Sequence, residues 1–577
     1  MPCLYRWMNL GRLLARLPPR TRLYTATALY GLAGGGVAVL FHLSIHAIYH
    51  ATFETWATKG TVFFALATLG LMLGVALLSG WLVNVRCPAA AGSGIPQLKL
   101  AFWKDFGWSA PQIMVLKFVV GSLSVGGGMS LGREGPSVQL AGTMGSWLAT
   151  RLGLAKQKHR MPAAAGAAAG LAAAFNTPLA AVTFVLEEII GDLNSRFLGN
   201  MLMASLLGAL VAHYVLGPQP AFHLSLPDEA GWQVYLLTPW VAAVATLVGV
   251  FFQWSSLKIR HWTKTQSTVA VWLLPCLGVL PTWLIGVTVF AKTGHLGVFS
   301  LGYADLSEAL AGHLTWQIVA LLLVTKLAAT ILCYGFGGCG GIFSPTLFLG
   351  AMAGLSAAAL AQCLMPLHDA DVSVLAVVGM CACMGAAVRA PVTGILIVFE
   401  MTHQFALVLP LMLGALVSQA ISRRLLPANF YDTILEQDGH HLHRIIPPRD
   451  LASWQQLPAS TIANFHPVAL TDLKPDTLRQ AIEQHPFANF PCVQDLRVTG
   501  VISRHVIEKA LLSGADVLPL RPSVATPQDS IGVVQDLLIQ SETGMAILCD
   551  DHGHLLGVVT LHDLVRAQAA YGGGLDK

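Results

Sequence analysis

The stretch that decides the fold reads Gly132-Arg-Glu-Gly-Pro136, and it interrupts a largely apolar part of the chain. Two further breaks read Gly92-Ser-Gly-Ile-Pro96 and Gly340-Gly-Ile-Phe-Ser-Pro345. In each break the glycines allow the backbone to turn without steric cost, and the proline lies where the first turn of a helix tolerates it. Each break therefore predicts the N-terminus of a helix.

Long apolar tracts surround these breaks. The 577-residue chain is 54% hydrophobic and 11% charged, whereas an ordinary soluble domain is about 25% charged. Tyr24–His50, Val62–Gly80 and Met161–Leu186 contain no Asp, Glu, Lys or Arg, and a spanning helix needs about 20 apolar residues. Because lipid offers no hydrogen-bond partners, we expect such tracts to be helical. The remaining apolar tracts lie near 110–130, 199–217, 236–253, 269–291, 315–335, 341–365, 372–399 and 405–421. The sequence thus predicts an all-α polytopic membrane protein.

Basic residues at both ends of this membrane part predict its orientation. The first twenty-two residues contain five arginines and no acid, and Arg423 and Arg424 follow the last apolar tract. By the positive-inside rule, the N-terminus and the C-terminal tail are expected on the cytoplasmic side of a cell (inner) membrane. The five arginines are Arg6, Arg12, Arg16, Arg20 and Arg22.

The composition divides the chain into domains. Charged residues become frequent from Leu451 onward, after a Pro447-Pro448 pair, and no later run could span a bilayer. The predicted domains are a cytoplasmic segment over 1–23, a transmembrane domain over 24–440, a linker over 441–454, and two similar soluble units over 455–512 and 517–570.

The membrane part contains an internal repeat. Pro136 and Pro345, in two of the breaks, are 209 residues apart. The later segments Ala173-Ala-Phe-Asn-Thr-Pro178 and Ala386-Ala-Val-Arg-Ala-Pro391 are 213 residues apart, and each precedes an apolar run that ends in an acid. Chance recurrence of Gly and Pro in Ala-rich helices is the alternative. Transporters often arise from such repeats, with the substrate site where broken helices of the two halves meet.

Helix N-termini at membrane depth predict an anion site. Such a terminus exposes unpaired N–H groups and carries about half a positive charge. Several converging termini would bind an anion without a Lys or Arg, which would hold the ion too tightly to release it. A glycine kink at a helix contact explains a single break as well, but the three in this order are more specific.

The three breaks resemble the GSGIP, GREGP and GxFxP signatures of the CLC family of chloride channels and transporters, without substitution. The resemblance covers nearly all of 24–440 and includes Lys117 and the glycine run 126–128. It implies the CLC fold, an inverted repeat of broken and tilted helices. It also implies a homodimer in membrane lipid with one anion pathway in each subunit.

Carried over motif by motif, the resemblance implies a chloride site. Ser93 and Tyr431 would donate hydroxyl hydrogen bonds, and the backbone N–H groups of Ile342 and Phe343 would complete the site. The preference for chloride over fluoride or nitrate rests on Ser93. The alternatives are a Ser93 hydroxyl bonded to its own helix backbone and a Tyr431 at the membrane interface.

Glu134 is the predicted gate. An ionised carboxylate at a helix N-terminus is stabilised by about 0.3–1 kcal/mol, and this is the purely structural alternative. The resemblance implies that Glu134 occupies an anion position when ionised and leaves it when protonated.

Glu187 and Glu188 end an uncharged run, and acids at membrane depth usually line ion or proton routes. Solvation at the cytoplasmic interface is the alternative. The resemblance implies that Glu188 is the inner proton-transfer residue and Glu187 its acidic neighbour, whereas Glu400 is interpreted as structural. Since passive channels of the family commonly lack the inner glutamate, its presence favours proton-coupled exchange.

The two soluble units resemble a pair of CBS domains, which are small α/β domains. Thr560 and Asp563 match positions that contact adenine nucleotides in that family, while Val506 stands where the first unit would need an acid. A purely structural dimer contact is the alternative role of this tail.

The sequence as a whole predicts a chloride/proton exchanger that is not an enzyme. The membrane part offers no catalytic pair, metal cluster or phosphate-binding Gly-Lys loop, and His42 and His46 are interpreted as helix or interface histidines. No cofactor is required for transport, an adenine nucleotide is an optional ligand of the CBS pair, and no nucleic-acid partner is expected. A passive chloride channel of the same fold and a nucleotide-sensing membrane protein remain the alternatives.

Overall fold

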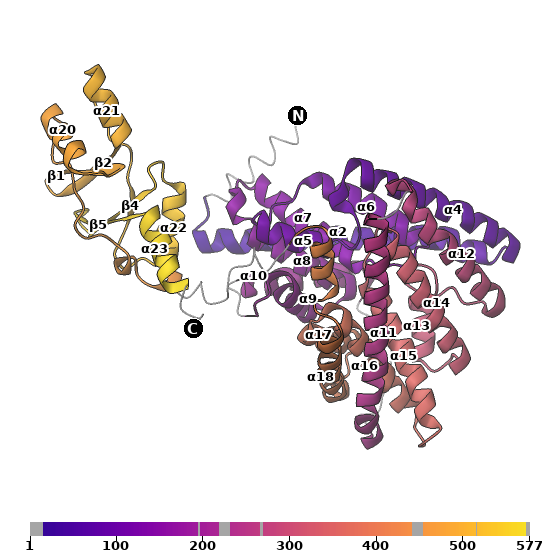
Figure 1. Cartoon of the computed structure of the whole chain (residues 1–577). Helices are drawn as coiled ribbons and strands as arrows, with labels where there is room; N and C mark the ends of the chain where they lie inside the picture. The colour runs from indigo at the N-terminus through magenta and orange to yellow at the C-terminus, as the bar shows by residue number, and fades with distance from the viewer. Residues whose placement is uncertain are drawn as a thin grey trace. The chain divides into compact units, whose positions relative to one another are not determined.

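The computed structural model describes residues 16–193, 197–217, 231–265, 269–440, 454–514 and 516–572. The chain forms two compact units, Met1–Ile445 and Ile446–Lys577 (Figure 1). The predicted linker over 441–454 lies outside the described residues except for Trp454, and the predicted N-terminal segment over 1–23 is described only from residue 16.

The first unit is helical. Its α-helices are α2 (Pro19–Tyr49), α3 (Thr55–Ala57), α4 (Thr61–Trp81), α5 (Ile95–Lys104), α6 (Pro111–Gly126), α7 (Glu134–Arg151), α8 (Arg160–Phe175), α9 (Pro178–Phe184), α10 (Leu198–Leu216), α11 (Trp232–Thr265), α12 (Leu274–Thr293), α13 (Tyr303–Leu310), α14 (Trp316–Gly335), α15 (Phe343–Gln362), α16 (Asp369–Val388), α17 (Pro391–Thr402), α18 (Val408–Leu425) and α19 (Phe430–Gln437). Single π-turns extend α2, α4 and α9, the last being η5 (Val185–Ile190).

Among the described residues, nine helical stretches are long and apolar enough to cross a membrane. This confirms the prediction of an all-α polytopic membrane protein. The nine are Pro19–Ala57, Thr61–Arg86, Leu198–Leu216, Trp232–Thr265, Val271–Thr293, Trp316–Gly335, Phe343–Gln362, Asp369–Val388 and Phe405–Gln437.

Two predicted tracts, Met161–Leu186 and 372–399, are each broken into two helices rather than continuous. The first breaks at Asn176, which has a left-handed φ of 58°, and the second at Arg389, with a φ of 61°. The next residue in each case is non-helical, with ψ of 79° at Thr177 and 83° at Ala390, and it precedes a proline. A proline disfavours the helical conformation in the residue before it and can itself start the following helix. An apolar tract of spanning length can therefore form two helices instead of one when it contains such a proline.

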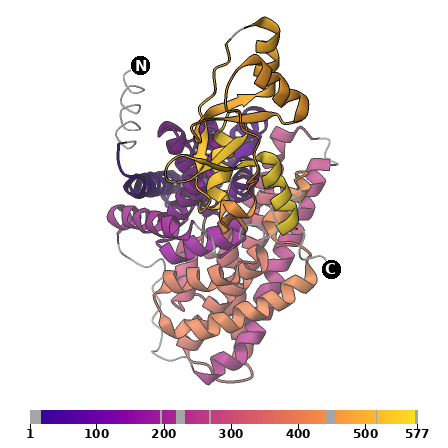
Figure 2. The ribbon, with the colours of Figure 1, turned by 90° about the vertical axis from the view of Figure 1, so that its left-hand side faces the viewer.

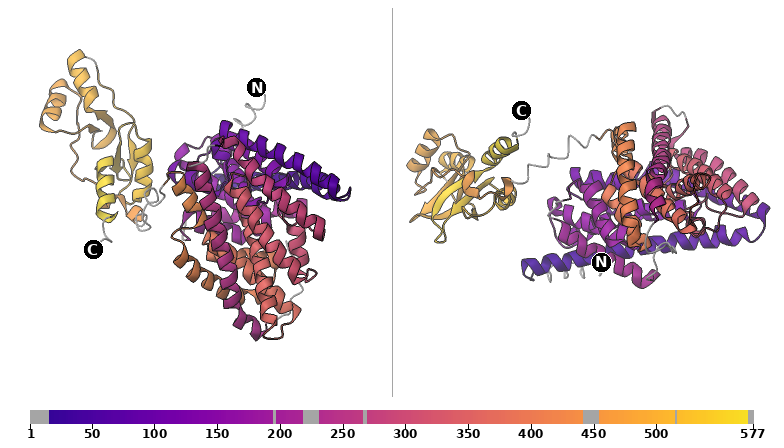
Figure 3. Two further views of the ribbon diagram at one scale, coloured as in Figure 1. Left: turned by 45° about the vertical axis from the view of Figure 1, so that its right-hand side comes forward. Right: turned by 90° about the horizontal axis from the view of Figure 1, so that it is seen from below.

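The two halves of this unit pack in matching pairs. Helix α7 lies against α8 and α15 against α16, while α2 lies against α8 as α11 lies against α16. Figure 3 shows the helices of this unit, in indigo to orange, packed side by side. The crossings are tight because they contain glycine. A Cβ at Gly166 would come within 2.2 Å of the Ala141 carbonyl oxygen, and one at Gly379 would come equally close to that of Gly350. Small residues let membrane helices approach closely, and Gly166 and Gly379 are themselves 213 residues apart.

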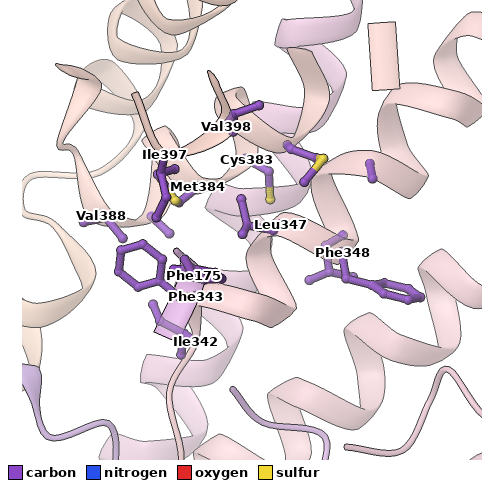
Figure 4. Packing of buried hydrophobic residues seen from close by; sticks show 14 of the residues in the cluster. Phe175, Ile342, Phe343, Leu347, Phe348, Cys383, Met384, Val388, Ile397 and Val398 are labelled. Carbon is purple, nitrogen blue, oxygen red and sulfur yellow. The ribbon is translucent and has the colours of Figure 1, made fainter. Parts of the chain in front are cut away.

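The start of α15 is embedded in the core of the unit. The rings of Phe175 and Phe184 lie 6.3 and 5.2 Å from that of Phe343, and Val388 and Met384 lie nearby (Figure 4). Ile342 and Phe343 are both fully buried. Their side chains thus anchor the N-terminus of α15 and leave its backbone N–H groups for other contacts.

The second unit is a small α/β unit, as predicted (Figure 2). Strands β1 (Asn489–Gln494) and β2 (Arg497–Ser503) pair antiparallel, with α20 (Pro475–Gln484) and α21 (Arg504–Ser513). In the other sheet β3 (Ser523–Ala525) runs parallel to β4 (Met545–Cys549), which pairs antiparallel with β5 (Leu555–Thr560). This sheet carries α22 (Ile531–Gln540) and α23 (Leu561–Gly572).

Candidate functional site

The N-termini of α7 and α15 are joined by their backbones. The N–H of Gly132 donates to the Gly341 carbonyl at 2.7 Å, and the N–H of Gly341 donates to the Gly132 carbonyl at 2.6 Å. Two of the predicted breaks therefore meet, although 209 residues separate these glycines. Both helices begin two residues later, so their first N–H groups face a common region.

The third break joins them at Ser93, just before α5. A Cβ on Gly135 would come within 2.3 Å of the Ser93 hydroxyl and 3.3 Å of the Gly341 Cα. Gly94 has a φ of 95°, which suits glycine, and its Cα faces the Gln139 side chain. Glycine is therefore required on both sides of this contact, and the structure brings the three predicted N-termini together.

The Glu134 carboxylate is completely buried and lies at the N-terminus of α15. One oxygen, Oε2, accepts the backbone N–H of Ser344 at 3.3 Å. The other, Oε1, accepts the Ser344 hydroxyl and, at 3.1 Å, the Tyr303 hydroxyl. The carboxylate of the first half thus sits where the N–H groups of the second half favour a negative charge.

A full cation also lies beside this carboxylate. Nε of Arg133 is 3.8 Å from Oε1 of Glu134, and its guanidinium donates to the Ala174 carbonyl at 2.9 Å. The expectation of an anion region formed without Lys or Arg is therefore wrong for the Glu134 end. The physical reason is that a buried acid in a low-dielectric interior needs a compensating charge.

Arg133 and Tyr303 also line a cavity of about 260 Å³. Its other walls include His42, His46 and Glu54. The His42 and His46 rings are stacked with centroids 6.4 Å apart, and Nε2 of His42 lies 3.4 Å from Nη1 of Arg133. Only the side chains of Arg133 and Tyr303, which both contact Glu134, thus separate the gate candidate from a space that water or an anion could enter.

The two predicted hydroxyl donors, Ser93 and Tyr431, lie close to each other. Ser93 and Tyr431 are 1% and 0% exposed, and neither hydroxyl has a hydrogen-bond partner among the described residues, although the Tyr431 hydroxyl lies near that of Ser93. Buried hydroxyls are normally satisfied, so an unpaired pair needs an explanation. Two donors that converge on a chloride would supply one. Ile342 is the N-cap residue of α15 and Phe343 is its first residue, so their N–H groups have no partner inside the helix.

Glu188 lies in η5 and is also buried. Its Oε1 accepts from the Lys99 ammonium at 2.9 Å, and its Oε2 accepts from the Asn429 side chain at 3.1 Å. The same ammonium donates to Asp432 at 2.7 Å. The predicted proton-transfer acid is therefore not solvated at an interface but held in a buried ionic cluster.

Glu187 points elsewhere and caps a helix. It accepts the N–H groups of Val392 and Thr393 at the start of α17, at 3.2 and 2.8 Å. Glu400 does the same for the start of α9, accepting from Leu179 and Ala180 at 3.0 and 2.7 Å. The two acids are 213 residues apart, and each caps a helix of the opposite half of the repeat. A proton-transfer role of Glu187 stays a prediction, since its oxygens already have a capping role.

In the tail, Thr560 and Asp563 bond to each other. Oδ2 of Asp563 accepts from the Thr560 hydroxyl at 2.6 Å and from the Thr560 N–H at 2.9 Å, just before α23. This reciprocal arrangement is a helix cap. A nucleotide at these residues stays a prediction, and it would have to compete with the cap.

Sequence reasoning gave no role to six residues of these clusters: Ser344, Tyr303, Arg133, Lys99, Asn429 and Asp432. Ser344 and Asp432 lie inside motifs that the sequence singled out, but only the motif residues with a known family role were assigned. Tyr303 follows Gly302, which has a left-handed φ of 75° like that of Gly94, so an extended repeat would have indicated it. Lys99 carries the weakest signal, a charge in a short apolar helix.

Comparisons with known proteins agree with this arrangement. Residues 75–423 match the family described as voltage gated chloride channel, and residues 515–570 match the CBS domain. The chain is 30% identical over 443 residues to the H(+)/Cl(-) exchange transporter ClcA of Salmonella arizonae, covering 74% of this chain and 91% of that protein.

Solved structures share the fold. A slow cyanobacterial Cl-/H+ antiporter superposes with a TM-score of 0.65 and 25% identity, covering 73% of this chain and 98% of that one. A eukaryotic CLC transporter, 20% identical, superposes with a TM-score of 0.61 over 94% of this chain and 98% of its own, which shows the fold alone. With its family match, its curated relative and the joined helix N-termini around Glu134, this chain belongs to the voltage gated chloride channel family and carries a C-terminal CBS domain.

Proposed function

We propose that the protein exchanges chloride for protons across a membrane, with Glu134 as the group that responds to both ions. The observation that carries this proposal is the hydrogen bond from the Ser344 N–H at the start of α15 to the Glu134 carboxylate. The Glu134 carboxylate therefore occupies an anion-binding helix N-terminus as an anion from the protein's own chain.

The exchange follows from the charge of that side chain. Ionised Glu134 is held by the N-terminus of α15, by the Ser344 and Tyr303 hydroxyls and by Arg133. Protonation removes its charge and with it most of this attraction. A chloride can then take the place of the carboxylate, and it leaves again when Glu134 loses its proton. Chloride and proton therefore use one position in alternation.

The routes on either side of the gate are part of the same proposal. Ser93, Tyr431 and the N–H groups of Ile342 and Phe343 form the chloride site next to the gate. Glu188 delivers protons from the side on which α19 leads into the tail. The printed name of the ClcA relative, an H(+)/Cl(-) exchange transporter, supports the same pair of ions for this chain.

We further propose that the protein works as a homodimer in lipid with both termini in the cytoplasm. Leu206 and Leu210 on α10 and Leu409 and Leu416 on α18 are each more than half exposed. Such apolar faces need cover from lipid or from a second copy. The basic pair Arg423 and Arg424 at the end of α18 favours a cytoplasmic tail.

Reconstitution into liposomes tests the exchange. A chloride gradient across sealed vesicles should drive protons against their own gradient, followed with a chloride electrode and a pH electrode at once. The rival is a passive chloride channel, for which the reversal potential depends on chloride alone. A reversal potential unaffected by a pH gradient would therefore reject the exchanger.

A further inference from the structure

Lys99 is a buried cation between two carboxylates. Its Nζ lies 2.9 Å from Oε1 of Glu188 and 2.7 Å from Oδ1 of Asp432. The Lys99 and Glu188 side chains are 8% and 3% exposed, whereas that of Asp432 is 36% exposed. The three groups therefore form a line from an accessible acid, through a cation, to an inaccessible acid.

The line is held by residues from separate elements. Lys99 lies in α5, Glu188 in η5 and Asp432 in α19. Asn429 joins the last two, since its amide donates to Oε2 of Glu188 and its Oδ1 accepts the N–H of Asp432 at 2.7 Å. Among the described residues, the Tyr431 hydroxyl lies near Glu188 and the Arg389 guanidinium lies near Asp432.

The cluster contains one cation and two carboxylates, so Lys99 has a second partner besides Glu188. A lysine paired with Glu188 alone would become an uncompensated buried charge whenever Glu188 accepted a proton, which is costly. Asp432 removes that cost, because Lys99 keeps one carboxylate partner in either state of Glu188. Glu188 can thus gain and lose a proton without leaving the ammonium unpaired.

We propose that Asp432 is the proton entry to Glu188 and that Lys99 carries the proton between them, an inference that rests on the proposed exchange function. The Lys99 ammonium gives one proton to the Glu188 carboxylate, so that one N–H bond breaks, one O–H bond forms and a neutral amine remains. Protonated Asp432 then gives its proton to the amine, which restores the ammonium and the Asp432 carboxylate. The net result is one proton moved from Asp432 to Glu188.

Asp432→Asn tests the entry in liposomes containing the full-length protein. Proton flux driven by a chloride gradient should fall about tenfold or more, while chloride flux persists. Asp432→Glu keeps a carboxylate and should retain proton flux. Glu436→Gln removes an exposed acid of the same helix and should change neither flux. Persisting chloride flux shows that a variant is folded, so undiminished proton flux in Asp432→Asn would overturn the proposal.

Lys99→Arg tests the carrier. Arginine keeps the positive charge but does not release its proton, so proton flux should fall as it does in Lys99→Met while chloride flux remains. Full proton flux in Lys99→Arg would overturn the relay and leave Lys99 a charge partner only. These outcomes are read against the unaltered protein. If that protein does not couple chloride to protons, the exchange function itself fails; if it couples and the variants couple equally, only the entry route fails.

Discussion

The two halves of the membrane unit share a scaffold but not their chemistry. Lys117 in α6 donates to the Gly92 carbonyl at 2.5 Å, and Lys326 in α14, 209 residues later, donates to the Ser300 carbonyl at 2.7 Å. Each buried lysine thus fixes the turn before a short helix, α5 or α13. Glu187 and Glu400 also correspond to each other, since each accepts two backbone N–H groups at the start of a helix in the opposite half.

The ionisable groups of the pathway break this symmetry. At the same offsets, Glu134 corresponds to Phe343 and Glu188 corresponds to Met401. The first half thus supplies Glu134 and Glu188, and the second half has buried apolar side chains at the matching positions. This difference teaches that the duplicated part determines where helix ends meet, while the residues that differ determine which ions are handled.

Glu134→Gln is expected to have the largest effect, because it makes the first half as uncharged as the second at this position. A neutral amide cannot alternate between an anion and an acid, so proton coupling should vanish while chloride still passes. Simultaneous chloride and proton flux from liposomes measures this. Glu54→Gln, which removes an exposed acid from the cavity that Arg133 and Tyr303 line, is the control and should keep coupling.

Glu188→Gln and Glu187→Gln together test which of these two adjacent acids transfers the proton. Proton flux should fall at least about tenfold, since Glu188 contacts Lys99, whereas chloride flux persists. Its neighbour Glu187 serves as the matched control, because its carboxylate is directed at α17. Equal loss of proton coupling in Glu187→Gln would instead support the proton-transfer role that the sequence predicted for it.

The helix caps formed by Glu187 and Glu400 test whether the two halves of the membrane unit stabilise each other equally. Glu187→Gln and Glu400→Gln each weaken two hydrogen bonds from backbone N–H groups to a carboxylate, and we expect each to cost about 1.5–3 kcal/mol. Thermal unfolding in detergent should show similar losses for both variants. A loss confined to one of them would mean that the halves do not stabilise each other equally.

Tyr303→Phe should have a smaller effect on the gate. It removes one of the hydroxyl donors to the Glu134 carboxylate, and a hydrogen bond to a charged group is worth about 1.5–3 kcal/mol, so the carboxylate should leave its position at least about tenfold more readily. Chloride turnover measured at several pH values should rise while coupling is retained. Unchanged turnover would show that the Ser344 contacts alone hold the carboxylate.

The smallest transport effect is expected in the tail. Thr560→Ala removes a helix cap and should lower the stability of that unit by about 1 kcal/mol without changing chloride or proton flux. Calorimetric titration of the full-length protein with ATP and AMP tests the nucleotide prediction, and heat that disappears in Thr560→Ala would support it.

Much of this fold could be predicted from local signals. Glycine and proline mark the starts of α5, α7 and α15, and their offsets reveal the repeat, because both residues act on the backbone near their own position. Apolar length was less reliable, since it joined α8 to α9 and α16 to α17 across proline-marked breaks.

The clusters around the acids could not be predicted in the same way. Tyr303 lies 169 residues from Glu134 in the sequence, and Lys99 lies 333 residues from Asp432. Tertiary packing alone brings these pairs together, and neither carries a pattern that points to its partner. Glu134 and Glu188 were found only because motifs surround them.

The most direct test of the central claim is anomalous diffraction from bromide-soaked crystals of Glu134→Gln beside the unaltered protein. Both crystals should show bromide between Ser93 and Tyr431, and the variant should show a further peak at the Ser344 N–H where the carboxylate lies. A variant without that added peak would contradict the claim that Glu134 and a halide compete for one position.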